Sequence, residues 1–255
     1  MKRWRLVALD LDGTLLDHEG NISNENQKWI KIAQQSGLEV TIATGRPLRL
    51  TKTFLELLDI KVPYVVANGS EVWAGPGQLL ERHLISARDI EFVLQLALQY
   101  GTHFWSSVVD HVFPPGCVPD HVEQYQWLKF GLKSEDPMII REIWNRLEDY
   151  GRLEVSSSDP SNIEVTPLGI TKATGLRRVC QYMDINPEHV VTIGDGLNDV
   201  AMMQWSGLGI AMGNAEEQVK EIADRVTVHH TKHGVAEAIK ILLYGEPHKT
   251  EATNE

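Results

Sequence analysis

Cysteine and long apolar runs are both scarce in this sequence. The two cysteines, Cys117 and Cys180, are separated by a distance that fits neither a zinc site nor a redox CxxC pair. We therefore expect two reduced thiols, as in a cytoplasmic protein. No apolar run reaches the length of a membrane-spanning helix, and the N-terminus lacks the apolar core and cleavage site of a signal peptide. The sequence thus predicts a cytoplasmic protein with no membrane partner.

Positive charge is scarce as well. The chain has 24 Lys and Arg residues against 35 Asp and Glu residues, which gives a formal net charge of -11. An acidic surface repels nucleic acid phosphates and anionic membranes, so neither is expected as the main partner. If the ligand is an anion, its binding requires locally concentrated positive charge, in a metal ion and a few lysines or arginines.

Short apolar segments alternate with helical patterns toward both ends of the chain. This alternation predicts an α/β fold with a wound parallel sheet and crossover helices. In the first part, strands are expected at 5–9, 38–43 and 64–67, with helices that begin after Ser23 and at Pro47. The helix from Pro47 carries apolar residues at helical spacing, namely Leu50, Phe54, Leu57 and Leu58. From Thr171 on, strands are expected at 190–193 and 208–211, and helices from Thr171, from Asp199, after an Asn214 cap and from Val235.

The segment 71–166 breaks this pattern. Two strand-like stretches surround Ala74-Gly75-Pro76-Gly77, which predicts a hairpin, and further strands follow beside helices capped at Ser86 and Asp136. Strands next to strands are typical of an α+β unit. We therefore expect an α/β core formed by 1–70 and 167–255, with an inserted α+β domain at 71–166. The polar stretch 248–255 is expected to be frayed.

Two carboxylates follow the first expected strand, in Asp10-Leu11-Asp12-Gly13-Thr14. Ligands of open α/β sheets bind at the carboxyl ends of the strands, so this position is informative. Carboxylates two positions apart in a turn can face one centre, where one acts as a nucleophile and the other transfers a proton. An acidic surface turn has the same composition, and both interpretations stay open for this segment alone.

Two further segments could bind a phosphate group. Thr44-Gly45-Arg46 follows the second strand, where a hydroxyl and backbone N–H groups at a helix N-terminus suit an anion. Taken alone, however, the tripeptide is better explained as a simple capping turn. Lys172 begins the helix after the insert, against the helix dipole, and a role in neutralising a carboxylate and a phosphate would explain it. A solvated surface lysine is the common alternative.

A third acidic segment, Gly194-Asp195-Gly196-Leu197-Asn198-Asp199, follows the strand at 190–193. Asp195 and Asp199 offer the oxygen ligands that Mg²⁺ prefers. An acidic turn with Asp199 as an N-cap is the structural alternative. The four segments nevertheless occur in order, each at the end of a strand or the start of the following helix, and this order favours a single site.

Together the four segments resemble the motifs of the haloacid dehalogenase (HAD) superfamily, over nearly the whole chain. The resemblance is closest to Cof-like members with a type II cap, where an insert lies between the second and third motifs, as 71–166 does here. Further matches are Ala67-Asn68-Gly69-Ser70, Ile163-Glu164-Val165-Thr166-Pro167 and Ala211-Met212-Gly213-Asn214-Ala215. One departure is His233-Gly234, where members often have Asp-Gly.

The resemblance implies a Mg²⁺-dependent phosphatase, monomeric or homodimeric, that acts on small phosphorylated metabolites. Asp10 is then the nucleophile that forms an aspartyl-phosphate, and Asp12 is the acid/base. Mg²⁺ is implied to bind the carboxylates of Asp10 and Asp195 and the backbone carbonyl of Asp12, with Asp199 orienting water. Thr44 and Lys172 are implied to hold the phosphoryl group. The other implied phosphate- and substrate-binding residues are Gly45, Arg46, Asn68 and Asn198.

Two alternatives stay open. A phosphosugar mutase needs cations in its cap for a second phosphate, but the cations of the insert form no clustered pair in the sequence. These cations are Arg82, Arg88, Lys129, Lys133, Arg141, Arg146 and Arg152. A catalytically silent binding or regulatory module would not need all four motifs.

The substrate stays open among sugar phosphates, phosphoglycolate-like acids, pyridoxal phosphate, and flavin or nucleotide monophosphates. Specificity is expected to lie in the cap. The cap side chains that could face the substrate are His103, Trp105, His111 and Phe113.

Overall fold

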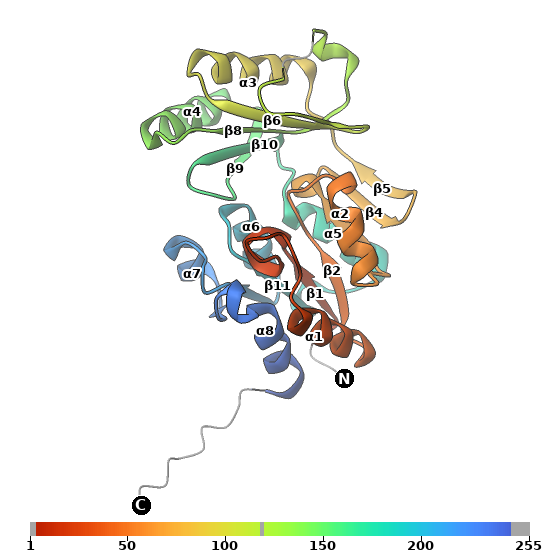
Figure 1. Ribbon diagram of the computed structural model, residues 1–255. Helices are drawn as coiled ribbons and strands as arrows, with labels where there is room; N and C mark the ends of the chain where they lie inside the picture. The colour runs from red at the N-terminus through yellow and green to blue at the C-terminus, as the bar shows by residue number, and fades with distance from the viewer. Residues whose placement is uncertain (1–3, 118–119, 246–255) are drawn as a thin grey trace, which may run out of the picture.

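The computed structural model describes residues 4–117 and 120–245. A five-stranded parallel sheet in the order β13-β12-β11-β1-β2 forms the core (Figure 1). Its strands are β1 (Leu6–Leu9), β2 (Glu39–Ile42), β11 (Val190–Gly194), β12 (Leu208–Ala211) and β13 (Arg225–Val226). The helices of the core are α1 (Asn24–Gln35), α2 (Leu48–Leu57), α5 (Lys172–Met183), α6 (Leu197–Trp205), α7 (Glu217–Ile222) and α8 (Gly234–Tyr244).

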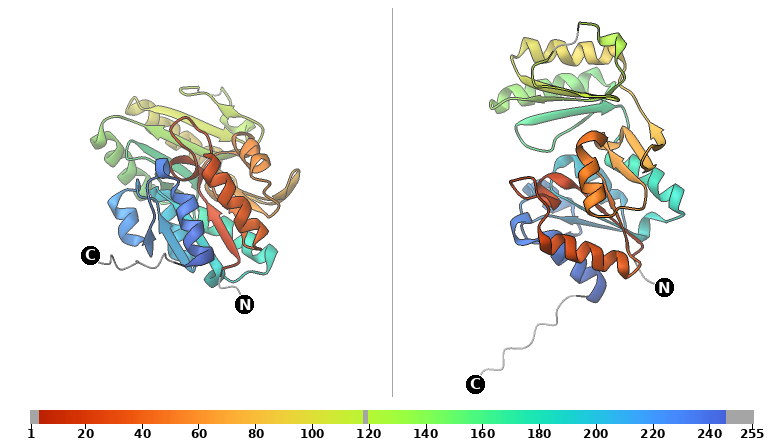
Figure 2. Two further views of the ribbon diagram at one scale, coloured as in Figure 1. Left: turned by 60° about the horizontal axis from the view of Figure 1, so that its bottom comes forward. Right: turned by 45° about the vertical axis from the view of Figure 1, so that its right-hand side comes forward.

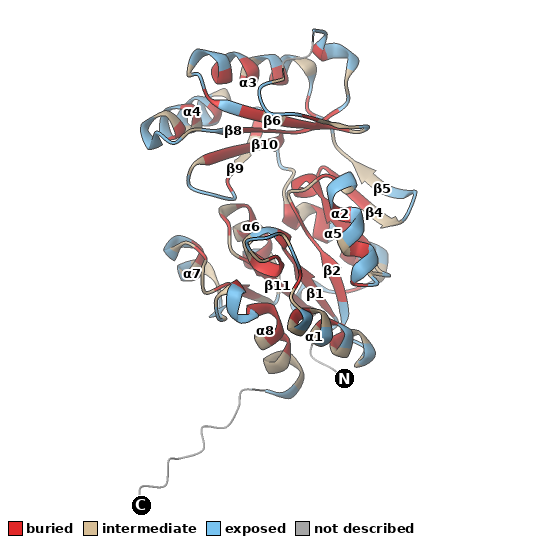
Figure 3. Cartoon of the chain, in the orientation of Figure 1, coloured by how far each residue is buried: buried red, intermediate tan, exposed pale blue. Residues whose placement is uncertain are grey.

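Helices cover both faces of this sheet because its strands are apolar on both sides. Val7 and Leu9 of β1 pack into a hydrophobic cluster with α1 and α8, whereas Leu6 and Ala8 pack into a second cluster with α5 and α6. The central strands are accordingly buried along their length (Figure 3). The predicted α/β fold with a wound parallel sheet is therefore confirmed.

A small three-stranded sheet continues the core beside β2. Strand β3 (Tyr64–Val66) meets the end of β2 through a parallel bridge between Ala43 and Val65, and pairs antiparallel with β4 (Glu71–Gly75). Strand β4 pairs in turn with β5 (Gln78–Arg82), which forms the predicted hairpin. The sequence places this hairpin in the insert, yet it pairs with a core strand. We therefore propose that the cap domain begins after Arg82 and ends at Thr166.

The cap is built on a second five-stranded sheet, in the order β7-β6-β8-β10-β9, with antiparallel pairing. Its elements are α3 (Ala87–Gln99), β6 (His103–Val108), β7 (Val112–Phe113), β8 (Trp127–Lys133), α4 (Pro137–Tyr150), β9 (Leu153–Ser156) and β10 (Asn162–Pro167). Both helices pack on one face of the sheet, and the opposite face looks toward the core (Figures 1 and 2).

Helix boundaries confirm some of the predicted caps and correct others. The side chains of Ser23, Ser86 and Asp136 cap α1, α3 and α4 as predicted. The predicted Asn214 cap is wrong, because α7 begins after Glu216 and the Asn214 amide donates to the backbone oxygen of Gly13 instead. Asp199 is not an N-cap either, since α6 already begins at Leu197.

Helix α2 packs along only one side. Thr51 and Leu55 are buried, whereas Leu50 and Leu57, which the sequence placed on the apolar stripe, are 48% and 55% exposed. The stretch 248–255, expected to be frayed, lies outside the described residues. Among the described residues, no helix is both long and apolar enough to cross a membrane.

Candidate active site

Asp10 stands at the carboxyl end of β1, where its backbone N–H donates to Ile193 of β11. The turn Leu11–Leu15 follows, and Gly13 in this turn has a φ of 77°. A side chain at this position would be strained, and a Cβ atom would lie only 2.1 Å from Oδ2 of Asp195. Glycine therefore allows the carboxylate of Asp195 to approach the turn that follows Asp10.

Lys172 joins two of the acidic residues. Its Nζ donates to Oδ1 of Asp10 at 2.6 Å and to Oδ1 of Asp199 at 2.7 Å, and all three side chains are buried. Burial alone disfavours the ammonium, but the charges of Asp10 and Asp199 outweigh it and raise the pKa of Lys172 above its ordinary value. The structure thus brings together residues that are far apart in the sequence.

The acidic cluster carries more negative charge than Lys172 balances. Burial raises the pKa of Asp10 well above its ordinary value, and the charges of Asp199 and Asp195 add to this effect against the opposing charge of Lys172. Burial also raises the pKa of Asp195 to about 7, with the charge of Asp199 acting in the same direction. Three carboxylates beside one ammonium leave an excess of negative charge that a divalent cation would neutralise.

The positions of these oxygens also fit such a cation. Carboxylate oxygens of Asp10, Asp195 and Asp199 lie within 4.8 Å of one another. Asp199, however, uses Oδ1 for Lys172 and Oδ2 for the backbone N–H groups of Asp195 and Gly196. Asp10 and Asp195 are therefore better placed to bind a metal directly, and Asp199 to fix the loop that carries Asp195.

Asp12 lies beside Arg46, which comes from the turn after β2. The guanidinium donates twice to the carboxylate, from Nε to Oδ2 at 2.8 Å and from Nη2 to Oδ1 at 2.6 Å. This hydrogen bonding raises the pKa of Arg46 above its ordinary value, although burial acts against it. Thr44 is fully buried, and its hydroxyl oxygen accepts from the backbone N–H of Arg46.

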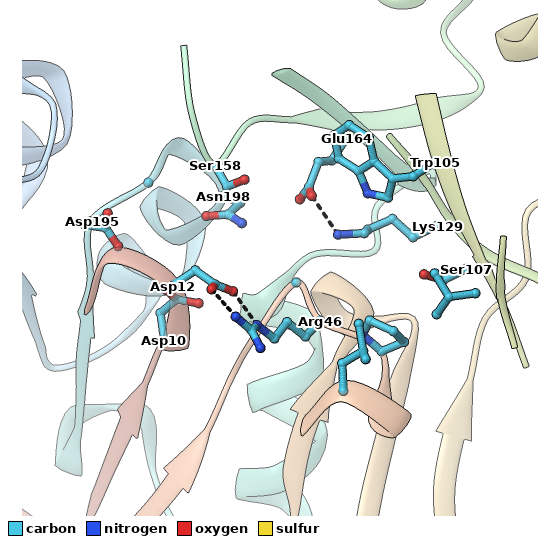
Figure 4. A pocket seen from close by; sticks show the side chains of 15 residues that line it. Asp10, Asp12, Arg46, Trp105, Ser107, Lys129, Ser158, Glu164, Asp195 and Asn198 are labelled. Carbon is cyan, nitrogen blue, oxygen red and sulfur yellow. Dashed lines mark hydrogen bonds and ion pairs between the residues drawn. The ribbon is translucent and has the colours of Figure 1, made fainter. Parts of the chain in front are cut away.

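A pocket with a volume of about 230 Å³ opens between core and cap at this cluster (Figure 4). Six of the predicted site residues line it: Asp10, Asp12, Gly45, Arg46, Asp195 and Asn198. Lys172 and Asn68 line an adjoining cleft that also reaches Asn198. Thr44 and Asp199 line neither cavity, and both are buried.

The cap contributes residues to this pocket that the sequence motifs do not predict. They are Ser107, Val112, Lys129, Ser158 and Glu164. Of the four cap candidates, only Trp105 lines the pocket. Phe113 packs in the hydrophobic core of the cap with His111 against its ring, and His103 is exposed. Successive side chains of a strand point to opposite faces of the sheet, so the alternation of polar and apolar residues along the cap strands is the sequence signal that could have found the pocket-facing positions.

Comparison with known proteins agrees with the architecture and the motifs. The sequence matches the family of haloacid dehalogenase-like hydrolases over residues 7–116 and 119–239. A relative from Bacillus subtilis, the 5-amino-6-(5-phospho-D-ribitylamino)uracil phosphatase YcsE, is 42% identical over 236 residues, which cover 92% of this chain and 94% of the relative.

Solved structures share the fold over the same extent. A haloacid dehalogenase-like hydrolase from B. subtilis superposes with a TM-score of 0.84 at 26% identity and covers 92% of this chain and 99% of its own. The HAD subclass IIB sugar phosphatase BT4131 has a TM-score of 0.80 at 22% identity, with coverages of 92% and 98%, and so supports the fold alone. Fold, ordered motifs and matched length together place this chain in the haloacid dehalogenase-like hydrolase family, as a phosphatase of the Cof-like group.

Proposed function

We propose that this phosphatase hydrolyses small phosphate monoesters with Mg²⁺, through an aspartyl-phosphate formed on Asp10. The observation that carries the proposal is the buried cluster in which Lys172 joins Asp10 to Asp199, beside Asp195. A carboxylate that approaches a phosphate dianion meets like-charge repulsion. Mg²⁺ would be held by the carboxylates of Asp10 and Asp195 and the backbone carbonyl of Asp12, and would supply positive charge against this repulsion.

The residues of the chain divide the reaction into two displacements. Asp10 forms a bond to phosphorus while the bond to the leaving oxygen breaks, and Asp12 gives that oxygen a proton. Asp12 then takes a proton from the water that attacks the aspartyl-phosphate, which releases phosphate and restores Asp10. Thr44 and Lys172 hold the phosphoryl oxygens during both steps.

Arg46 is proposed to bind the phosphate ester and, before substrate arrives, to fix the position of Asp12. The bidentate hydrogen bonding of Arg46 to Asp12 orients the Asp12 carboxylate in the pocket. A phosphate group offers the same paired oxygens to a guanidinium. Substrate can therefore take over Arg46, which frees Asp12 to take up a proton from solvent and pass it to the leaving oxygen.

The pocket offers little support for the alternative of a phosphosugar mutase. A second phosphate needs a cation in the cap, and Lys129 is the cap cation that lines the pocket. Its Nζ is paired at 2.6 Å with Glu164, so its charge is already balanced. This pairing favours hydrolysis over transfer within a bisphosphate.

The name of the 42% identical relative suggests a substrate to test first, 5-amino-6-(5-phospho-D-ribitylamino)uracil. We propose that this chain acts on the same class of ester, in which phosphate is bound to a polyol chain that carries a heterocycle.

Phosphate release from this ester and from the other candidate metabolites, with Mg²⁺ and with excess chelator, tests the function. We expect turnover with Mg²⁺, none with chelator, and an aspartyl-phosphate on Asp10 that mass spectrometry detects after rapid acid quench. Full activity in excess chelator, or phosphate trapped on another residue, would contradict the proposed mechanism.

A further inference from the structure

The face of the cap sheet that looks into the pocket carries an unusual set of side chains. Trp105 of β6 and Glu164 of β10 both lie opposite Gly131 of β8, and Ser107 of β6 lies opposite Lys129 of β8. Directly opposite residues of antiparallel strands share a face of the sheet. An indole, an ammonium, a carboxylate and a hydroxyl are thus gathered on one wall, above the catalytic carboxylates (Figure 4).

Gly131 shapes this wall. A Cβ atom at this position would lie 2.3 Å from Cε2 and from Cζ2 of Trp105. The indole therefore lies across the glycine, against the strand backbone, in space that any side chain would occupy. One side of the ring is covered by the sheet, and Trp105 remains partly exposed where it lines the pocket. This arrangement offers a flat apolar platform to a ligand.

Lys129 and Glu164 form an almost completely buried ion pair on the same wall. Each side chain is 6% exposed, and their contact measures 2.6 Å. The second oxygen of Glu164 accepts from the Asn68 amide of the core, at 2.7 Å. Burying such a pair has a desolvation cost that an apolar pair would avoid, so its place in a pocket points to a binding role.

The wall has spare donors and few spare acceptors. Both oxygens of Glu164 are used, by Lys129 and by Asn68. The ammonium of Lys129 has three donor positions, of which Glu164 takes one, and within the described part of the chain it has no other partner. The indole N–H of Trp105 likewise has no hydrogen-bond partner among the described residues. A ligand that complements this wall has acceptor atoms at the edge of a flat ring.

We propose that Trp105 and Lys129 form a leaving-group subsite that selects phosphate esters ending in a planar heterocycle with carbonyl oxygens. The ring stacks on the indole, and its carbonyl oxygens accept from the ammonium. The pocket extends from Trp105 and Lys129 to Asp10 and Asp12, so a ligand that binds at the wall can carry a phosphate that reaches the carboxylates. This inference rests on the proposed phosphatase function and adds the residues that recognise the leaving group.

The test compares two esters that differ only in the ring. One is 5-amino-6-(5-phospho-D-ribitylamino)uracil, and the other is ribitol 5-phosphate, which has the same phosphorylated chain without the heterocycle. We expect kcat/KM to favour the ring ester in the wild type. Trp105→Leu should lower this preference about ten- to hundredfold, Lys129→Met about tenfold, and Trp105→Phe, which keeps a flat ring, should retain most of it. Lys133→Met is the matched control, because Lys133 lies on the same strand with a side chain 46% exposed.

Binding to the Asp10→Asn variant separates this proposal from the proposed function. Titration calorimetry should give a Kd about tenfold lower for the ring ester than for ribitol 5-phosphate, and Trp105→Leu in the same background should remove the difference. Equal affinity for the two esters would overturn the proposed subsite. A Trp105→Leu substitution that weakens the binding of both esters to the same extent would overturn it as well. A clear binding preference with no phosphate release by the wild type would support the subsite and overturn the proposed function.

Discussion

A single substitution of Asp10 can separate its proposed role in catalysis from its contribution to stability. It is the first carboxylate after β1, and it is one of the two partners of Lys172. Asp10→Asn keeps the size of the side chain but removes the proposed nucleophile, so turnover should fall by at least about a thousandfold. The melting temperature should not fall, because burial disfavours the charge of Asp10, and the substitution removes this charge together with its repulsion by Asp199 and Asp195.

Phosphate release and thermal unfolding, followed on the same preparation, check this prediction. Asp59→Asn is the control, since Asp59 is exposed and has a left-handed backbone conformation that asparagine tolerates. Near-normal turnover of Asp10→Asn would show that another group attacks phosphorus.

Residues in contiguous motifs could be predicted from the sequence, whereas their contacts could not. Asp10, Asp12 and Asp195 were expected to meet because parallel strands end at one edge of the sheet. The position of Lys172 indicated that it neutralises a carboxylate, as it does for Asp10, but its second contact, with Asp199, could not be predicted because it depends on side-chain directions. The contact of Arg46 with Asp12 was missed for the same reason, since it depends on side-chain directions across two turns.

At the scale of elements, order and type of the strands and helices followed from periodicity and turn residues. The pairing of the hairpin Glu71–Arg82 did not, because its alternation fits either sheet and only the contact with β3 decides. The pocket-facing side of the cap sheet could have been found from the alternation in β6, β8 and β10. Apolar residues there pack toward the helices, and polar ones alternate with them.

The contact between Gly131 of β8 and the indole of Trp105 leads to a prediction. Gly131→Ala adds one methyl group where the indole of Trp105 now lies, so the ring must move off the strand. The preference for the ring ester over ribitol 5-phosphate should fall about tenfold, because the ring of the ester can no longer stack on the displaced indole. The kcat for ribitol 5-phosphate should change little. Steady-state kinetics with both esters measures this. Gly75→Ala is the control, because no atom lies within 4 Å of its added Cβ, and an unchanged preference in Gly131→Ala would argue against the platform.

At the scale of the whole molecule, the cap is expected to act as a lid that sets substrate choice. All the acidic residues of the cluster belong to the core, while Trp105 and Lys129 belong to the cap. Replacing residues 83–166 with a short flexible linker should therefore keep metal-dependent hydrolysis of p-nitrophenyl phosphate but abolish discrimination among metabolites. The hairpin up to Arg82 is retained because it pairs with β3. A folded core with the original metabolite preference would show that the core itself sets specificity.

Stability of the whole protein should depend on pH through the acidic cluster. The pKa of Asp195 is raised to about 7 in the folded protein, from an ordinary value of 3.8. When the pKa of a carboxyl group is higher in the folded protein than in the unfolded chain, the folded state holds the proton more tightly. Its contribution to the free energy of unfolding is largest below the unfolded pKa and is lost as pH rises through the folded pKa. Asp10 shifts in the same direction. The cluster therefore destabilises the metal-free protein progressively between about pH 4 and pH 7.

Mg²⁺ should reverse this loss, because the cation takes the place of the proton between the carboxylates. We expect added Mg²⁺ to raise the melting temperature clearly at about pH 8 and hardly at about pH 5. Asp195→Asn removes both the titrating group and a proposed metal ligand, so subtracting its pH profile isolates the contribution of Asp195 from that of other carboxylates. Opposite trends come from groups such as Asp89, whose hydrogen bonds to Arg152, Ser86 and Tyr150 outweigh burial and lower its pKa. Equal stabilisation by Mg²⁺ at both pH values, or the same effect in Asp195→Asn, would show that the cation binds elsewhere.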